Sequence, residues 1–157
     1  MTRIYTPISI PLPIETVFNY VTDPGNWPQW HPSSLSVSGA VGHSLEIGEQ
    51  VTEEYLVAGR RGNVTWTVIE RIFPRLWTIE GKIAGSSGQG QVRYVLQSQD
   101  GGTLFGREFT YSMGSLFYSV LNRVFIRRRI EAESWQAVRQ LKKVLLEQQA
   151  SSASTSM

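Results

Sequence analysis

Residues 114–149 read GSLFYSVLNRVFIRRRIEAESWQAVRQLKKVLLEQQ and form the longest stretch of the chain with a helical pattern. After Gly114 the stretch contains no glycine or proline, the residues that most often interrupt helices. Its apolar residues recur at three- and four-residue steps and so share one helical face: Phe117, Val120, Leu121, Val124, Trp135, Val138 and Leu145. At about 1.5 Å per residue, such a helix would be roughly 50 Å long. We therefore expect one long C-terminal helix from about Gly114 to Gln149.

Before this helix, most of the chain has the pattern of short strands joined by turns. Alternating or β-forming residues predict strands at 3–10, 34–41, 50–57, 63–72, 76–83, 91–99 and 103–113. A first short helix is expected over Pro13–Val21 and a second after Asp23, since proline and aspartate favour helix starts. Because short turns join successive strands, the sheet should be antiparallel. The expected fold is α+β, with a curved antiparallel sheet of about six to seven strands around the long C-terminal helix and two short helices after the first strand.

Composition favours a single globular domain. The chain has 157 residues, 41% of them hydrophobic and 18% charged, which suits one folded domain over residues 1–149 with a flexible tail at 150–157. The absence of cysteine excludes disulfides, thiol catalysis and sulfur-ligated metals. No apolar run approaches the roughly 20 residues that cross a bilayer, and no apolar signal-peptide core follows Met1, so a cytoplasmic protein without an integral membrane segment is expected.

Charge is concentrated in the C-terminal stretch. The chain carries a net charge of +2, whereas residues 123–147 hold seven basic and three acidic residues, or 7 − 3 = +4. A basic helix can contact nucleic acid or an anionic membrane, but a solvated outer face is the favoured interpretation. No nucleic-acid partner is expected, because basic and aromatic residues are not interleaved on the predicted strands as RNA-binding sheets require.

Five short segments carry a family resemblance when they are taken in order. They are IPLPIETVF at 10–18, DPGNWPQW at 23–30, VIERIFPRLW at 68–77, GGTL at 101–104 and QLKK at 140–143. Together they resemble the START-like superfamily, which includes the birch-pollen-allergen fold and bacterial polyketide cyclase/dehydrase-like proteins. The resemblance implies the helix-grip fold, with a hydrophobic cavity between helix and sheet for lipids, sterols, polyketides or similar molecules. It implies no single activity, because members include carriers, receptors and enzymes.

Large aromatic side chains are the candidate cavity lining. Alternation along the strands points Trp66, Trp77, Tyr94, Phe109 and Tyr111 toward the helix, and the remaining candidates lie outside the strands: Trp27, Trp30, Phe117, Leu121 and Val124. The alternative is that each of them packs in a closed core. The first half of the helix, Phe117 to Phe125, is expected to form the ligand wall, and Trp135 to Leu145 the core.

Polar candidates are few. Arg128 and Glu131 share the predicted apolar face of the helix, so they are either exposed to solvent or form a polar floor in which Arg128, with Arg107, binds a ligand carboxylate or carbonyl. His31 follows the tryptophan pair and could transfer protons, although capping or exposure is the simpler interpretation. No metal or cofactor is expected, because two isolated histidines make no metal site and no nucleotide-binding or nucleophile-elbow motif is present.

Three functions fit these observations. The favoured one is binding of a hydrophobic small molecule, such as a lipid, polyketide or aromatic compound, by a monomer or homodimer. The second is a cyclase/dehydratase-like enzyme in which Arg128 or Arg107 stabilises an enolate and His31, Tyr94 or Tyr111 transfers protons. The third is an adaptor that uses the basic helix to contact a partner or a membrane.

Overall fold

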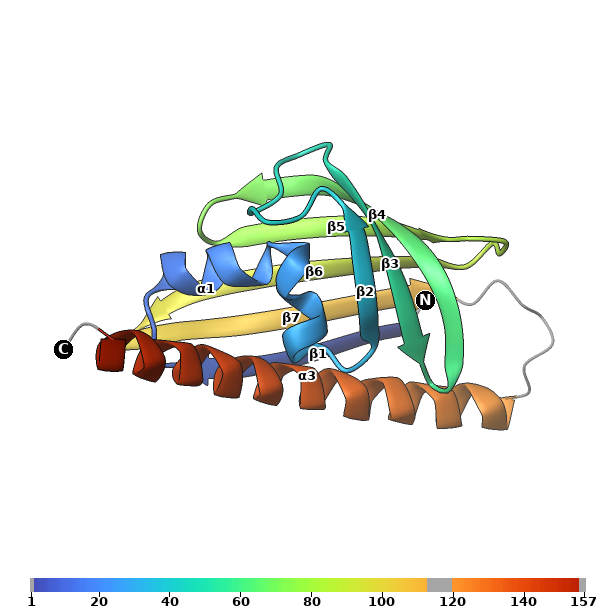
Figure 1. Ribbon diagram of the computed structural model, residues 1–157. Coiled ribbons are helices and arrows are strands. Elements are labelled where there is room, and N and C mark those ends of the chain that lie inside the picture. The colour runs from blue at the N-terminus through green and yellow to red at the C-terminus, as the bar shows by residue number, and fades with distance from the viewer. Residues whose placement is uncertain (1, 113–119, 156–157) are drawn as a thin grey trace.

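The computed structural model describes residues 2–112 and 120–155 (Figure 1). Its elements follow in order: β1 (Thr2–Ile10), α1 (Ile14–Val21), the 3-10 helix η1 (Pro24–Asn26), α2 (Trp27–Trp30), β2 (Ser34–Gly39), β3 (Gln50–Val57), β4 (Arg60–Ile72), β5 (Leu76–Ile83), β6 (Gln89–Gln99), β7 (Gly102–Ser112) and α3 (Val120–Thr155). This is the expected α+β helix-grip fold. None of the described helices is both long and apolar enough to cross a membrane.

The seven strands form one antiparallel sheet in the order β1-β7-β6-β5-β4-β3-β2. Each strand from β2 to β7 pairs with its sequence neighbour, and β1 pairs with β7 from Thr2↔Tyr111 to Ile10↔Thr103. Figure 1 shows α3 running along the curved sheet, with α1 beside its C-terminal end. α3 packs on β1 and α2 and so covers one face of the sheet, which is its inner face.

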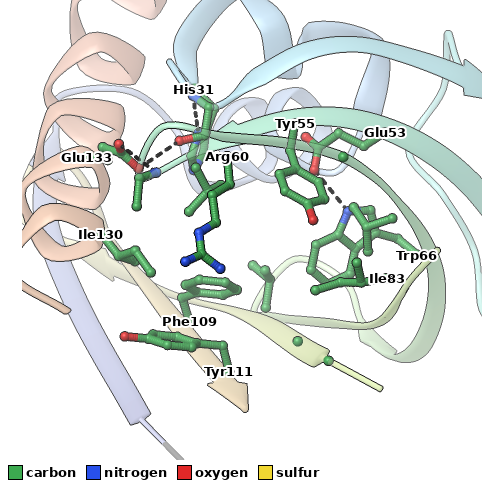
Figure 2. Close-up of a pocket in the computed structure, with 18 of the residues that line it drawn as sticks. His31, Glu53, Tyr55, Arg60, Trp66, Ile83, Phe109, Tyr111, Ile130 and Glu133 are labelled. Carbon is green, nitrogen blue, oxygen red and sulfur yellow. Dashed lines mark hydrogen bonds between the residues drawn. The ribbon is translucent and has the colours of Figure 1, made fainter. Parts of the chain in front are cut away.

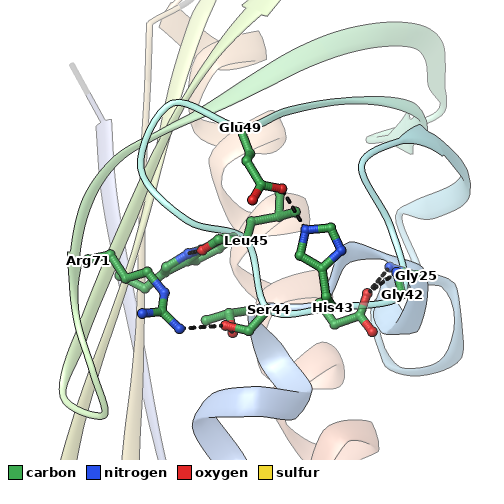
Figure 3. Close-up of polar contacts among 10 residues, drawn as sticks. Gly25, Gly42, His43, Ser44, Leu45, Glu49 and Arg71 are labelled. Atoms are coloured by element: carbon green, nitrogen blue, oxygen red, sulfur yellow. Dashed lines mark hydrogen bonds and ion pairs between the residues drawn. The ribbon is translucent and has the colours of Figure 1, made fainter.

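Polar contacts fasten the loop between β2 and β3 to the end of α1 (Figure 3). The Asp23 carboxylate accepts the backbone N–H groups of Gly25 and Gly42, both at 3.0 Å. The backbone N–H of Leu45 donates to the Thr22 carbonyl at 3.0 Å. The bonds from Gly42 and Leu45 join this loop to the end of α1 and so hold the loop in place there.

The main core occupies the same end. Its centre is formed by Trp30 and Trp77, which are 1% and 0% exposed, together with Phe18 of α1 and Leu141 of α3. The Trp77 indole also donates to the Leu45 carbonyl at 3.1 Å. A second, smaller cluster lies toward the start of α3 and consists of Ile4, Tyr111, Ile126 and Ile130. Phe109 packs against both clusters, but α3 contributes different residues to each of them, so the two clusters follow one another along α3.

Two glycines on adjacent strands make room for Trp66 on the inner face. A Cβ atom added at Gly81 would lie 2.6 Å from the Trp66 ring, and one at Gly90 would lie 3.3 Å from it. Gly81 pairs with Trp66 across β4 and β5 and with Gly90 across β5 and β6. The indole can therefore lie close over the sheet instead of filling the interior.

The helix differs from its prediction in extent and in orientation. α3 continues past Gln149 to Thr155, so the described part of the expected tail, 150–155, is helical. The predicted face was wrong near its middle: Val124 and Phe125 are 45% and 63% exposed, whereas Ile126 and Ile130 are buried. Ile126 and Ile130 lie four residues apart on a second apolar stripe, about 160° around the helix axis from the stripe of Val124 and Arg128. The burial of the two isoleucines shows that this second stripe faces the interior.

Substitution of Gly81 tests the close approach to Trp66. Alanine in a strand interior is ordinarily more stable than glycine, but Gly81→Ala should lower the free energy of unfolding by about 1–3 kcal/mol because the new methyl group collides with the indole. Chemical denaturation measures the change. In the double variant Gly81→Ala/Trp66→Leu the collision with the indole is gone, while the close contact of the new methyl group with Val64 Cγ2 at 2.8 Å remains, so the two effects should be non-additive. A neutral Gly81→Ala, or strict additivity, contradicts this packing.

Candidate ligand-binding cavity

A cavity of about 480 Å³ lies between the inner face of the sheet and residues 126–134 of α3. This volume is within the range of about 300–1,000 Å³ typical of small-molecule sites. Figure 2 shows Trp66, Phe109 and Tyr111 of the sheet facing Ile130 and Glu133 of α3 across the space. Further apolar lining comes from Trp27, Val57, Val64, Ile79, Ile83, Val92 and Ile126. The wall is therefore mainly aromatic and aliphatic.

The cavity opens between two hairpins. Its exposed lining residues are Arg60 and Arg61 after the β3–β4 turn, and Ala84, Ser86 and Gln89 around the β5–β6 turn. The opposite end of the cavity meets the main core at Tyr94, which is 3% exposed. A ligand would thus enter at the hairpin end and advance toward the core.

Arg107 of β7 is the charged group at the inner end. It is only 6% exposed, and its Nη1 atom donates to the Ser134 hydroxyl of α3 at 3.3 Å. Its Cζ atom lies 5.4 Å from the centre of the Phe109 ring, and its Nε atom has no hydrogen-bond partner. Within the part of the chain that the structure describes, no carboxylate lies within 4.0 Å of it. Burial lowers the pKa of the guanidinium, opposed by Tyr94 and Glu53.

Glu53 of β3 adds a carboxyl group to the same cavity. One of its oxygens accepts the indole N–H of Trp66 at 3.1 Å (Figure 2). Burial raises the pKa of this carboxyl above its ordinary value, while the hydrogen bond from Trp66 and the charge of Arg107 act in the opposite direction. A carboxyl group in this environment can accept or deliver a proton closer to neutral pH than an exposed one.

His31 is held as a neutral hydrogen-bonding group. It follows α2, where its backbone N–H donates to the Trp27 carbonyl at 2.8 Å, and its Nδ1 atom accepts the Ser33 N–H at 3.1 Å. Burial, and secondarily the charge of Arg107, holds the pKa of the imidazole well below its usual range. Since Nδ1 is the acceptor, the ring proton is assigned to Nε2. His31 is therefore suited to donate a hydrogen bond and not to act as a base.

Tyr94 lies beside Arg107 at the boundary between cavity and core. Its ring stacks on Trp77 at 5.2 Å and meets Phe105 at 5.1 Å between ring centres. Burial raises the pKa of its hydroxyl, although Arg107 acts in the opposite direction. The phenol is consequently neutral and positioned by packing.

Glu133 joins α3 to the loops beside the opening. Its carboxylate accepts the Ser33 hydroxyl at 3.2 Å and the Ala58 N–H at 3.3 Å, and it pairs with Arg129 at 3.6 Å. Its charge is therefore already compensated by neighbouring groups.

The structure brings together many, but not all, of the residues predicted to bind a ligand. Those that line the cavity are Trp27, His31, Trp66, Tyr94, Arg107, Phe109 and Tyr111. Trp77 of β5 lies in the core instead, because alternation predicts the face of a residue but not its depth, and Trp30 of α2 is buried in the same core. Val124 and Arg128 are exposed to solvent, because the inward stripe of α3 is the other one. Phe117 and the side chain of Leu121 lie outside the described residues.

Several lining residues were missed. Glu53 shares the inward strand phase with Val51, which alternation could have shown, and Ser134 lies four residues after Ile130 on the inward stripe. The expected ligand wall at Phe117–Phe125 is replaced by Ile126–Ser134 for the described part of the helix. No cluster of three or more metal-binding side chains occurs among the described residues.

Several solved structures share this architecture at low sequence identity. TTHA0849 from Thermus thermophilus is 13% identical, with a TM-score of 0.71 over 93% of this chain and 98% of that one. Protein Ms6760 from Mycobacterium smegmatis is 17% identical, with a TM-score of 0.68 over 93% and 92% of the two chains. Ara h 8.0201 is 12% identical, with a TM-score of 0.67 over 93% and 98%. At these identities the likeness concerns the fold.

The sequence itself assigns the family. No curated protein matches the chain. The family model described as "Polyketide cyclase / dehydrase and lipid transport" matches residues 1–146, which is nearly the whole sequence. The chain therefore belongs to the polyketide cyclase/dehydrase and lipid-transport family of the START-like superfamily.

Proposed function

We propose that the chain binds a hydrophobic small molecule, such as a lipid, a polyketide or an aromatic compound, in the cavity between the sheet and α3. The observation that carries this proposal is an apolar space of about 480 Å³ beside a closely packed core. Protein interiors ordinarily contain few voids larger than a water molecule. The family description, which names polyketides and lipid transport, supports the same chemistry.

The residues around the cavity favour occupancy by an apolar body. Trp66 is kept against the sheet by the space at Gly81 and Gly90, and so leaves the interior open. Ile126 and Ile130 present aliphatic surface from the opposite wall. Filling such a space with ligand atoms recovers dispersion contacts that the empty cavity lacks.

Hydrophobic ligands should therefore stabilise the protein. A ligand present at 100 times its Kd adds about 2.7 kcal/mol to the free energy of unfolding, and the melting temperature rises accordingly. Ile130→Trp should abolish this rise, because the indole occupies the cavity. Ile72→Trp, at a side chain that is 50% exposed on β4, is the matched control and should retain it. Thermal denaturation with a panel of fatty acids, sterols and aromatic polyketides makes the measurement, and a panel that never shifts the wild-type melting temperature contradicts the proposal.

A second candidate function is proton abstraction next to a carbonyl. Glu53, with a raised carboxyl pKa, shares the cavity with the cationic Arg107. In such a reaction Glu53 would take a proton from the α-carbon, the C–H electron pair would form the enolate, and Arg107 would stabilise the oxygen that gains the charge. This differs from the proposal made from the sequence, in which His31, Tyr94 or Tyr111 transfers the proton, in using Glu53 as the base.

Exchange of α-protons tests this second function. A hydrophobic 3-oxoacyl thioester in D₂O should exchange faster with the protein present, as followed by NMR. The rate should fall as the pH drops through the raised pKa of Glu53, because only the ionised carboxylate is a base. Glu53→Gln should remove the acceleration and leave ligand binding intact. Glu54→Gln, at the neighbouring position that pairs with Arg61 at 3.1 Å, is the control. Equal acceleration by wild type and Glu53→Gln refutes this function.

A further inference from the structure

We propose that the ligand is an amphipathic acid, an apolar body whose anionic oxygen binds Arg107 at the inner end of the cavity. This inference rests on the proposed binding function and specifies the chemical class of its ligand. Carboxylates are the main candidates, and an enolate formed from a carbonyl compound would present the same charge.

The first argument is the uncompensated charge of Arg107. A guanidinium stays protonated in proteins, and buried charges are normally paired. Arg107 is 6% exposed, but the described residues place no carboxylate within 4.0 Å of it and its Nε atom has no partner. The acceptor that it does contact is the neutral hydroxyl of Ser134, at 3.3 Å, and its neighbour across the strands is the neutral phenol of Tyr94. An anion in the cavity would supply the missing countercharge.

The second argument is that the two acidic groups lining the cavity are otherwise engaged. Glu133 is neutralised by Arg129 and by two hydrogen-bond donors. Glu53 accepts the Trp66 indole, and burial raises the pKa of its carboxyl. Neither carboxyl forms an ion pair with Arg107, so both leave the guanidinium available to an incoming anion.

The third argument is the position of Arg107 along β7. Tyr111, Phe109, Arg107 and Phe105 alternate on the inner face, and the first three line the cavity. Phe105 is 0% exposed and belongs to the core, so Arg107 marks the closed end. At about 3.3 Å per residue, Tyr111 and Arg107 are separated by roughly 13 Å along the strand. An acid that inserts head first would place its apolar body against Phe109 and Tyr111.

The fourth argument is that the other polar group near this end is a donor. The neutral His31 ring carries its proton on Nε2, because Nδ1 accepts the Ser33 N–H. The charge of Arg107 acts on the imidazole, which places His31 within the field of the guanidinium. A donor next to a cation is complementary to an anionic oxygen and not to a ligand amine.

The test compares four probes that share one chain and differ in the head group: dodecanoate, dodecanol, methyl dodecanoate and dodecylamine. Their affinities for the full chain are measured below their micellar concentrations, by quenching of tryptophan fluorescence at a mildly alkaline pH. Dodecanoate should bind about tenfold or more tighter than dodecanol and the ester, because a charge-assisted hydrogen bond in a buried site is stronger than a neutral one. Dodecylamine should bind weakest.

Arg107→Met keeps an apolar side chain of similar length and removes the charge. In this variant dodecanoate should lose its advantage while dodecanol binds at least as well as to wild type. Arg128→Met, on the exposed face of α3, should leave all four affinities unchanged. If Arg107→Met does not fold, the ranking of the four probes on wild type decides alone.

The outcomes separate the two proposals. Equal binding of dodecanoate and dodecanol to wild type, or a preference for dodecanoate that survives in Arg107→Met, overturns the recognition of an acid and leaves hydrophobic binding standing. If none of the four probes binds and no ligand of the larger hydrophobic panel shifts the melting temperature, both the recognition of an acid and the binding of hydrophobic molecules are overturned.

Discussion

The burial of Arg107 between β7 and α3 is the constraint on which the rest of the interior depends. Its hydrogen bond to Ser134 joins the sheet to the helix at the level where the packed core ends. Replacement of such a group by an apolar residue would let the core extend further, whereas a charged group requires polar or solvated surroundings. The same charge influences the pKa values of His31, Glu53 and Tyr94, so one residue affects every titratable group at the inner end of the cavity.

The closely packed core and the cavity lie toward opposite ends of the fold. At one end, the hydrogen bonds of Asp23 and Leu45 fasten the β2–β3 loop to α1 over a closely packed tryptophan core (Figure 3). At the other end, glycines at positions 81 and 90 remove side-chain volume and keep Trp66 against the sheet. One continuous sheet runs through both ends, so the closely packed half can support the half that holds the cavity. The cavity is thus built by small residues and a buried charge as much as by its apolar walls.

The sheet was more predictable from sequence than the helix, for a geometric reason. A strand has a side-chain period of two, so Tyr94 and Phe109 could be assigned to the inner face from their neighbours alone. Around residues 127–129 the helix offers two apolar stripes, and only tertiary packing selects the stripe of Ile126 over that of Val124. The sequence also could not predict how deeply an inward side chain is buried. Trp66 and Trp77 both point to the inner face, but Trp66 lines the cavity and Trp77 lies wholly in the core. Glu53 was overlooked because a carboxylate on an inner face is unusual without a cavity.

The most direct measurement is identification of the molecule that co-purifies with the full chain, by native mass spectrometry followed by denaturation and small-molecule analysis. The buried cation predicts a hydrophobic compound with an ionisable acidic group, bound with one molecule per chain. It also predicts that Arg107→Met, purified in parallel, loses this compound. A neutral hydrophobic molecule retained equally by wild type and Arg107→Met would show that the charge of Arg107 does not select the ligand.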